Sequence, residues 1–294
     1  MVDYHIHPDF SHDAQGSVDE FCTRAAEIGL GEICFTTHYE PDPARSSIEH
    51  VRVNGVAQPV NSDWPDSYLA AIRGARTKFA DLVVLAGVEV GYEPGLEGVI
   101  GDFLSRFQFD FVLGSVHCLE HVAITAGDEL DRFKREQLSL GPEHFAESYF
   151  RNVRAAAGTQ LFDCLGHLDI YRKYIRPLFD SRFDQAVDTR LPSVLKFVAE
   201  SGTGMEVNTS ALRRGNAEPY PELRILKLAR NAGVRVFTTG SDAHRPADLG
   251  MGLDMALRSL NDLGVEPARF RQRRVISPAQ RRPRAASRLG FRSA

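Results

Sequence analysis

Short runs of apolar residues, many of them β-branched, alternate along this chain with longer stretches in which apolar residues recur every three or four positions. The short runs predict strands that are buried on both faces, and the longer stretches predict amphipathic helices. The predicted strands cover residues 2–7, 32–37, 82–90, 109–114, 161–166, 204–208 and 234–239. The predicted helices cover residues 17–29, 65–80, 96–107, 143–157, 184–201, 220–232 and 247–263.

Seven strand-then-helix units follow one another in this pattern, an order typical of parallel strands covered by helices. The start of the first helix is marked by Ser17 and by Glu20 three residues later, which together form a capping-box signal, and Gly29 is suited to its end. No glycine-rich dinucleotide loop follows any predicted strand. We therefore expect an α/β fold, and a closed or nearly closed (β/α) barrel rather than a doubly wound sheet.

Two connections are much longer than the others. Residues 41–65 follow the second predicted strand, and residues 119–141 follow the fourth. Connections of this length in a compact domain are usually binding loops or lids. We interpret both segments in that way.

The composition is that of a globular protein, with 294 residues of which 43% are hydrophobic and 25% charged. Its four cysteines form no CxxC pair and are typical of reduced, buried thiols; they are Cys22, Cys34, Cys118 and Cys164. No apolar run approaches the ~18 residues of a membrane span, and the first residues lack a signal-peptide pattern. These features predict a cytoplasmic protein that has no membrane partner.

Charge is distributed unevenly along the chain. The net charge is −4, yet residues 267–294 hold nine arginines and no acidic residue, which leaves −13 on the rest. An acidic body argues against a nucleic-acid partner, because phosphate contacts need clustered Lys and Arg. Residues 269–294, rich in Arg, Pro, Ser and Ala, are predicted to form a mobile tail, either a solvated end or an arm that attracts phosphate groups. Nothing in the pattern indicates an oligomeric state.

Most of the histidines fall at the carboxyl ends of predicted strands. These are His5, His7, His38, His117, His167 and His244, and Glu89 and Asp242 occupy similar positions. Because the carboxyl ends of barrel strands share one face, the topology is expected to gather these residues into one cluster. His5 and His7 are two apart on a strand, so their rings point to the same side. The remaining histidines His50, His121 and His144 fall outside the pattern and are interpreted as surface or loop residues.

A set of histidines and carboxylates without cysteine suits Zn, Mn or Fe and leaves positions open for water. With His12 from the loop after the first strand, the set offers more ligands than the four of a structural zinc. We therefore expect two or three divalent metal ions. One carboxylate, assigned to Glu89, would bridge a pair of ions ~3.5–4 Å apart, the separation used for in-line displacement at phosphorus.

These residues stand in short motifs that resemble those of a known family. The motifs are Asp3-Tyr4-His5-Ile6-His7, Ser11-His12-Asp13, Phe35-Thr36-Thr37-His38, Gly87-Val88-Glu89, Gly114-Ser115-Val116-His117, Gly166-His167 and Gly240-Ser241-Asp242-Ala243-His244. In this order they resemble the PHP (polymerase and histidinol phosphatase) domain, and its stand-alone histidinol-phosphatase branch in particular. The resemblance spans residues 1–265 and leaves residues 266–294 outside as the basic tail.

The resemblance implies a distorted (β/α)7 barrel with a trinuclear metal site at the carboxyl ends of its strands. Carried over by position, it gives three ligand groups: His5, His7, Glu89 and Asp242 for the first metal, Glu89, His117 and His167 for the second, and His12, His38 and His244 for the third. Two departures are Pro8, where many relatives carry threonine, and the segment after His117, which lacks a glycine and tryptophan run found in many histidinol phosphatases.

The implied activity is the hydrolysis of a small-molecule phosphate ester, with L-histidinol phosphate, an intermediate of histidine biosynthesis, as the first candidate. A metal-bridging hydroxide would attack phosphorus, and the leaving alkoxide would take a proton from water, Asp242 or a nearby histidine. Glu89, Asp242 and His244 are the candidate catalytic residues. Arginines suit the phosphate, and the resemblance points to the loops that contain Arg172, Arg213 and Arg214.

Three alternatives stay open. The first is a PHP phosphoesterase for a nucleotide or a sugar phosphate, the second is an exonuclease, and the third is a non-catalytic protein stabilised by metal. Histidinol phosphate also carries positive charge. The loop acids Glu40, Asp42 and Glu120 are hypothetical partners for it.

Overall fold

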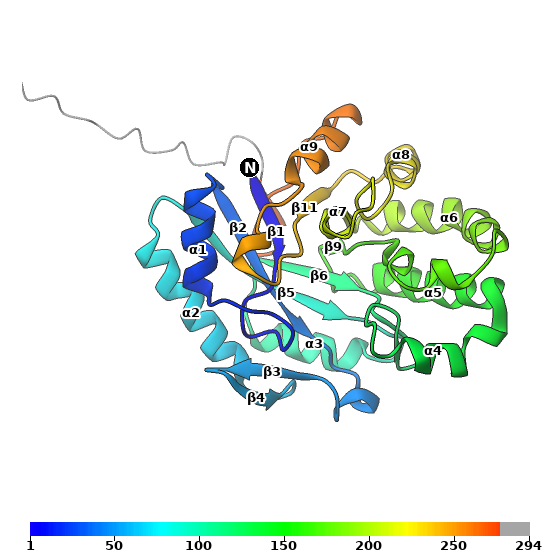
Figure 1. The fold of residues 1–294 in the computed structure, drawn as a ribbon. Helices are drawn as coiled ribbons and strands as arrows, with labels where there is room; N and C mark the ends of the chain where they lie inside the picture. The colour runs from blue at the N-terminus through cyan, green and yellow to red at the C-terminus, as the bar shows by residue number, and fades with distance from the viewer. Residues whose placement is uncertain (277–294) are drawn as a thin grey trace, which may run out of the picture.

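The computed structural model describes residues 1–276 and contains a seven-stranded parallel sheet with helices around it (Figure 1). Every pairing in this sheet is parallel. In spatial order the strands are β1 (Val2–Ile6), β2 (Glu32–Tyr39), β5 (Val83–Gly91), β6 (Phe111–Ser115), β9 (Cys164–Leu165), β10 (Gly204–Asn208) and β11 (Phe237–Gly240). The seven predicted strands and the (β/α)7 architecture are confirmed.

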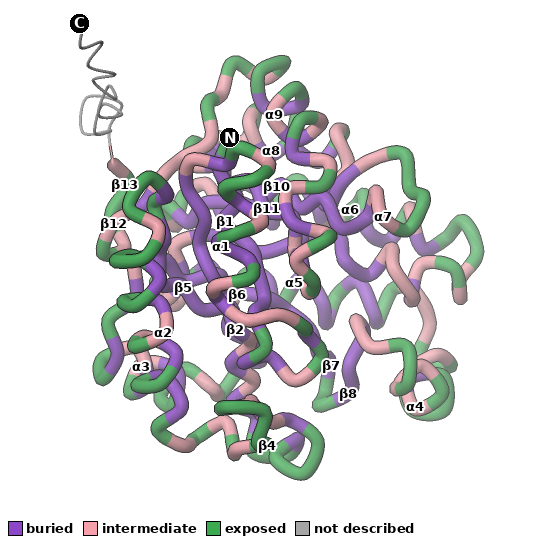
Figure 2. Tube along the Cα trace, turned by 60° about the vertical axis from the view of Figure 1, so that its left-hand side comes forward, coloured by how far each residue is buried: buried purple, intermediate pink, exposed green. Residues whose placement is uncertain are grey.

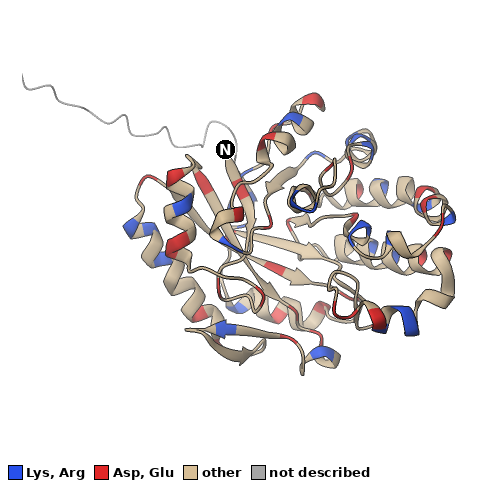
Figure 3. Cartoon of the chain, viewed as in Figure 1, with Lys and Arg blue, Asp and Glu red and all other residues tan. Residues whose placement is uncertain are grey.

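Seven helices follow these strands, as the pattern predicts. They are α1 (Val18–Glu27), α2 (Trp64–Lys78), α3 (Glu97–Arg106), α5 (Gly141–Thr159), α6 (Arg182–Ser201), α8 (Leu223–Ala232) and α9 (Leu253–Asp262). The capping box of α1 is formed by Ser17 and Glu20. Figure 2 shows the strands as the buried centre of the molecule, and Figure 3 shows charges of both signs interspersed on the outer helices.

The barrel closes between β1 and β11 by an irregular seam rather than a full ladder. Its backbone contacts are a single bridge, Ile6 with Ala243, and two hydrogen bonds, from Asp242 N to His5 O (2.8 Å) and from His7 N to Ala243 O (2.9 Å). The buried carboxylate of Asp3 adds to them, because it accepts a hydrogen bond from Ser241 N at 2.8 Å. At this seam the barrel is therefore closed by isolated contacts and not by a regular ladder.

The two long connections carry secondary structure that the sequence pattern did not predict. The first contains the 3-10 turn η1 (Pro43–Arg45) and the hairpin β3 (His50–Val53) with β4 (Val56–Pro59). The second contains the hairpin β7 (Cys118–Leu119) with β8 (Val122–Ala123), then α4 (Leu130–Glu136) and η2 (Leu138–Leu140). The remaining short elements are η3 (Ile170–Arg172), η4 (Arg176–Leu178), α7 (Ser210–Arg213) and η5 (Pro246–Asp248).

The segment predicted as a mobile tail begins in an ordered hairpin, β12 (Phe270–Arg271) with β13 (Arg274–Val275). Phe270 is buried against Tyr4 and Phe111, at the amino ends of the strands. Arg271 pairs with the buried Glu32 at 3.0 Å, and Arg273 pairs with Asp163 at 3.1 Å. The first part of the tail therefore differs from the expectation. The boundary at residue 265 stays a prediction, and residues 277–294 lie outside the described residues.

All four cysteines are free and buried, as expected. Among the described residues, no helix combines the length and apolar character that a membrane span needs.

Candidate metal centre

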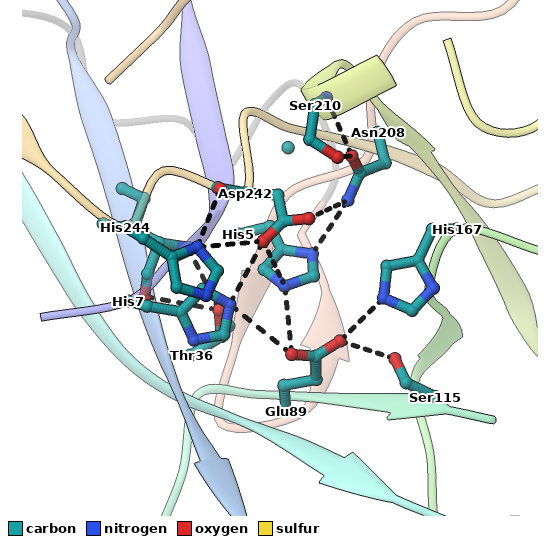
Figure 4. A network of polar contacts seen from close by, with 12 residues as sticks. His5, His7, Thr36, Glu89, Ser115, His167, Asn208, Ser210, Asp242 and His244 are labelled. Carbon is teal, nitrogen blue, oxygen red and sulfur yellow. Dashed lines mark hydrogen bonds and ion pairs between the residues drawn. The ribbon is translucent and has the colours of Figure 1, made fainter. Parts of the chain in front are cut away.

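The predicted ligands other than His12 converge at the carboxyl ends of the barrel strands. They come from β1 or directly after it (His5, His7), from β2 (His38), from β5 (Glu89), from the segments after β6 and β9 (His117, His167), and from the loop after β11 (Asp242, His244). Figure 4 labels His5, His7, Glu89, His167, Asp242 and His244 among them. His5, His7 and Glu89 are fully buried. Residues from both ends of the chain therefore share one site, as the strand-end pattern predicts.

Glu89 lies between two groups of imidazoles. Its Oε2 is 3.2 Å from His5 Nε2, 3.4 Å from His7 Nε2 and 3.0 Å from His38 Nδ1. Its Oε1 is 3.2 Å from His117 Nε2 and 3.0 Å from His167 Nε2. Each carboxylate oxygen thus faces a different set of nitrogens, which is the arrangement that a carboxylate bridging two cations requires.

Four groups in this region have ligand atoms within 4.8 Å of one another: His5, His7 and Glu89; Glu89, His117 and His167; His7, His38 and His244; and His38, Glu40 and His117. Asp242 joins the first and third of these groups. Its Oδ1 is 3.6 Å from His5 Nε2, 3.4 Å from His7 Nε2 and 3.5 Å from His244 Nδ1. The groups overlap, so neighbouring cations would share ligands.

Several of these atoms are buried and lack a hydrogen bond. They are His5 Nε2, His7 Nε2, His38 Nδ1 and Glu89 Oε2. Buried polar atoms without a partner are costly, and they are uncommon in folded proteins. A divalent cation would satisfy them. Imidazole nitrogen with carboxylate oxygen is a donor set that fits Zn, Mn or Fe, so the residues present fit a metal centre.

The pKa shifts in the cluster differ from one group to the next. Burial raises the pKa of Glu89, but His5 and His117 outweigh it and hold that pKa well below its usual value. Burial lowers the pKa of His7, and the neighbouring His38 and His244 lower it further. His7 is thus held neutral beside an ionised carboxylate. Burial also acts to lower the pKa of His5 and His117, but Glu206 and Glu89 raise that of His5, and Glu40 and Glu89 raise that of His117, well above the usual value. A metal ion would have to displace the protons of His5 and His117.

The ligand imidazoles are oriented by partners on their other ring nitrogen. His5 Nδ1 lies 2.7 Å from Glu206 Oε1, and His117 Nδ1 lies 2.6 Å from Glu40 Oε1. Glu206 Oε2 also accepts a hydrogen bond from His167 N at 2.9 Å. Such partners fix the ring and the tautomer so that the opposite nitrogen is free for a metal.

Sequence reasoning did not single out Glu206, although β10 is the one barrel strand to which it assigned no ligand. A carboxylate in that strand was the available signal. Glu40 was considered as a partner for a cationic substrate. The structure instead places its carboxylate on His117.

A model of the PHP domain family matches residues 3–210 of the chain, a range that holds most of these ligands. The chain belongs to the PHP domain family. It is 29% identical to a probable histidinol-phosphatase of Deinococcus radiodurans, over 94% of this chain and 98% of the relative. It is 25% identical to the histidinol-phosphatase of Bacillus subtilis, over 87% of this chain and 97% of the relative.

The fold of this PHP domain is similar to that of a histidinol phosphate phosphatase from Lactococcus lactis, solved in complex with zinc, L-histidinol and phosphate. The TM-score is 0.74, the identity is 21%, and the match covers 94% of this chain and 98% of that one. This similarity shows that the fold is shared.

His12 differs from the other predicted ligands of the PHP domain. It lines the cavity at the metal centre, but none of the ligand groups described above includes it. Its ring lies beside that of His50, with 5.1 Å between the centroids. The third ligand group found here contains His7 together with His38 and His244. The assignment of His12 stays a prediction.

The three predicted phosphate-binding arginines do not line this cavity. Arg172 donates to Asp169 Oδ2 at 3.1 Å and to Pro219 O at 2.9 Å, and it pairs with Glu222 at 3.2 Å. The guanidinium of Arg213 is bonded to the carbonyl oxygens of Ser241 and Asp242, and that of Arg214 lies 5.6 Å from the centre of the Tyr174 ring. Their role in phosphate binding therefore stays a prediction.

The cavity over the metal centre has a volume of about 210 Å³, and both long connections contribute to its wall. Arg45 joins the two connections: it donates to Glu49 Oε1 at 2.6 Å and to both carboxylate oxygens of Glu129, at 2.6 and 2.9 Å. Because Arg45 is 3% exposed, this ion-pair network is largely shielded from water. The prediction that the long connections are binding loops or lids agrees with this placement at the cavity.

Proposed function

We propose that this PHP domain is a metal-dependent phosphomonoesterase that hydrolyses L-histidinol phosphate to L-histidinol and phosphate, a step of histidine biosynthesis. The observation that carries the proposal is Glu89, whose two carboxylate oxygens face separate imidazole groups at the base of the cavity. The substrate is taken from the names of the relatives, which align over almost their whole length.

The proposed ligands would together hold two or three divalent cations, Zn, Mn or Fe. Bound there, such cations supply Lewis-acid activation of water and neutralise the charge of the phosphate. Glu89 keeps the cation sites close together. Glu206 and Glu40 hold the rings of His5 and His117 in one tautomer.

Asp242 and His244 line the same cavity and are the candidates for passing a proton to a leaving alkoxide. The Asp242 carboxylate is held by Asn208 Nδ2, at 3.3 Å from Oδ2. His244 Nε2 lies 3.3 Å from Asp13 Oδ2. We assign Glu89, Asp242 and His244 as the catalytic residues.

The substrate end away from the phosphate carries positive charge, and the wall formed by the long connections is acidic. Glu49, Asp128 and Glu129 line it. The acids Glu40 and Asp42 are occupied by His117 and His121, at 2.6 Å each. Glu49 and Glu129 are likewise paired with Arg45, at 2.6 Å each. We propose that Asp128, which has no cationic partner within residues 1–276, receives the cationic end.

Phosphate release by the Zn- or Mn-loaded protein tests the proposal, with L-histidinol phosphate compared with AMP and p-nitrophenyl phosphate. We expect kcat/KM for histidinol phosphate to exceed the others by about 100-fold, which corresponds to ~2.7 kcal/mol of transition-state binding. Similar low rates on all three would overturn the substrate and direct the search to other small phosphate esters. No release from any of them would overturn the phosphatase itself.

A cytoplasmic location belongs to the same proposal. The four cysteines are free and buried, as in proteins of a reducing compartment.

A further inference from the structure

The cavity over the metal centre is rich in negative charge. Its lining includes seven acidic residues: Asp13, Glu40, Glu49, Glu89, Asp128, Glu129 and Asp242. Its lining cations are Arg45 and Lys173. A phosphate monoester is a dianion near neutral pH, so the protein's own positive charge in this cavity bears directly on its binding.

The two cations are in different situations. Arg45 is bonded to Glu49 and to both oxygens of Glu129, so its charge is already paired. Lys173, which follows η3, donates from Nζ to the carbonyl oxygen of Thr125 at 2.8 Å. Within residues 1–276 its ammonium has no carboxylate at ion-pair distance. Its Nζ also lies 5.0 Å from the centre of the Tyr174 ring. Only one of its three N–H donors has a hydrogen-bond acceptor among the described residues, so the others are available to a ligand.

The surroundings of Lys173 place it near the proposed reaction centre. Thr125, its hydrogen-bond partner, lines the same cavity from the second long connection. Burial lowers the pKa of Lys173 and Arg214 lowers it further, while the carboxylates of Asp242, Asp13 and Glu89 act in the opposite direction. A largely buried ammonium without a counter-ion is costly, and an anionic ligand in the cavity would remove that cost.

We propose that the Lys173 ammonium binds a phosphoryl oxygen of the substrate and is a specificity-determining residue for phosphate dianions. This inference rests on the proposed function. The Thr125 carbonyl holds the side chain in place, and the free N–H groups donate charge-assisted hydrogen bonds, which are about twice as strong as neutral ones. Lys173 adds to the cations of the metal centre a positive charge supplied by the protein.

Calorimetric titration of the Mn-loaded protein with inorganic phosphate tests the role directly. Lys173→Gln keeps an N–H donor but carries no charge, and Lys173→Arg keeps the charge. Lys196→Gln is the matched control, because Lys196 lies on the exposed face of α6, where its partner Glu200 is 3.8 Å away. We expect phosphate affinity to fall at least tenfold in Lys173→Gln, to stay within threefold in Lys173→Arg and to be unchanged in Lys196→Gln.

Metal content and melting temperature are measured on each variant, so that a damaged fold is recognised. Phosphate affinity within twofold of the parent in Lys173→Gln would overturn the inference, and so would an equal loss in Lys173→Arg. The substrate assignment is tested separately. Loss of phosphate binding in a protein that does not hydrolyse histidinol phosphate would support the role of Lys173 and overturn that substrate.

Discussion

Replacing Glu206 with glutamine should weaken metal binding, although Glu206 does not line the cavity. Its carboxylate holds His5 Nδ1 at 2.7 Å and accepts a hydrogen bond from His167 N at 2.9 Å. Glutamine can satisfy one of these contacts only. With its NH2 group toward His5, the imidazole must carry its proton on Nε2, the atom that faces Glu89 and Asp242. With the amide turned over, two N–H groups face each other at His167.

The expected loss of metal affinity follows from the hydrogen bond between Glu206 and His5 or His167 that glutamine cannot keep. A hydrogen bond to a charged group contributes about 1.5–3 kcal/mol, and replacing such partners of metal ligands typically costs ~10–100-fold in metal affinity. We expect a loss in that range. Competition with a chromophoric chelator at neutral pH measures it, and Glu200→Gln on the exposed face of α6 is the control. Affinity within twofold of the parent would refute the assignment of Glu206 as the partner that orients His5.

Four further results are expected. His7→Ala should lower the metal-to-protein ratio more than His12→Ala, because the ligand groups include His7 and not His12; elemental analysis measures both ratios, and equal losses would contradict the grouping. Chelation by EDTA should abolish phosphate release and lower the melting temperature, and adding Zn or Mn should restore both, because a ligand bound to the native state stabilises it; full activity after complete metal removal would contradict the proposed chemistry. Phe270→Ala should lower the free energy of unfolding by about 3–5 kcal/mol in denaturant titrations while KM stays constant, since Phe270 packs at the end of the barrel opposite the site. Burial raises the pKa of Asp3 from 3.8 to about 6, so the folded state binds the proton more tightly, and the unfolding free energy should fall relative to Asp3→Asn as pH rises between these values; parallel pH profiles would contradict this.

The barrel and its ligand cluster could be predicted because both depend on local signals. The strands are short and largely apolar segments, and β10 was predicted with the bounds observed. The histidines stand at the ends of these strands, so the topology of the fold was sufficient to predict that they form one cluster. Glu206 lies within β10 and Glu40 directly follows β2. Their positions alone do not show that they contact ligand imidazoles, because these contacts depend on neighbours distant in the sequence.

The sequence also did not show which way individual side chains point, and this limited the prediction of the residues that line the cavity. Arg172 and Lys173 are adjacent, and sequence reasoning chose the arginine for the cavity. Arg172 instead donates hydrogen bonds to the buried Asp169 and to the Pro219 carbonyl and does not line the cavity, whereas Lys173 does. The start of the tail was mispredicted for the same reason. An arginine-rich composition predicts a solvated end, but Arg271 forms an ion pair with Glu32, more than 200 residues earlier in the sequence.

The seam between β1 and β11 has a consequence for how the protein matures. His5 and His7 come from the first strand, and Asp242 and His244 follow the last, so the proposed ligands lie on both sides of this seam. During synthesis the ligand set stays incomplete until β11 has emerged and docked, and capture of the metal would mark a finished barrel. A cation bound across the seam also closes a loop of roughly 235 residues, which restricts the unfolded chain and slows the separation of its two ends.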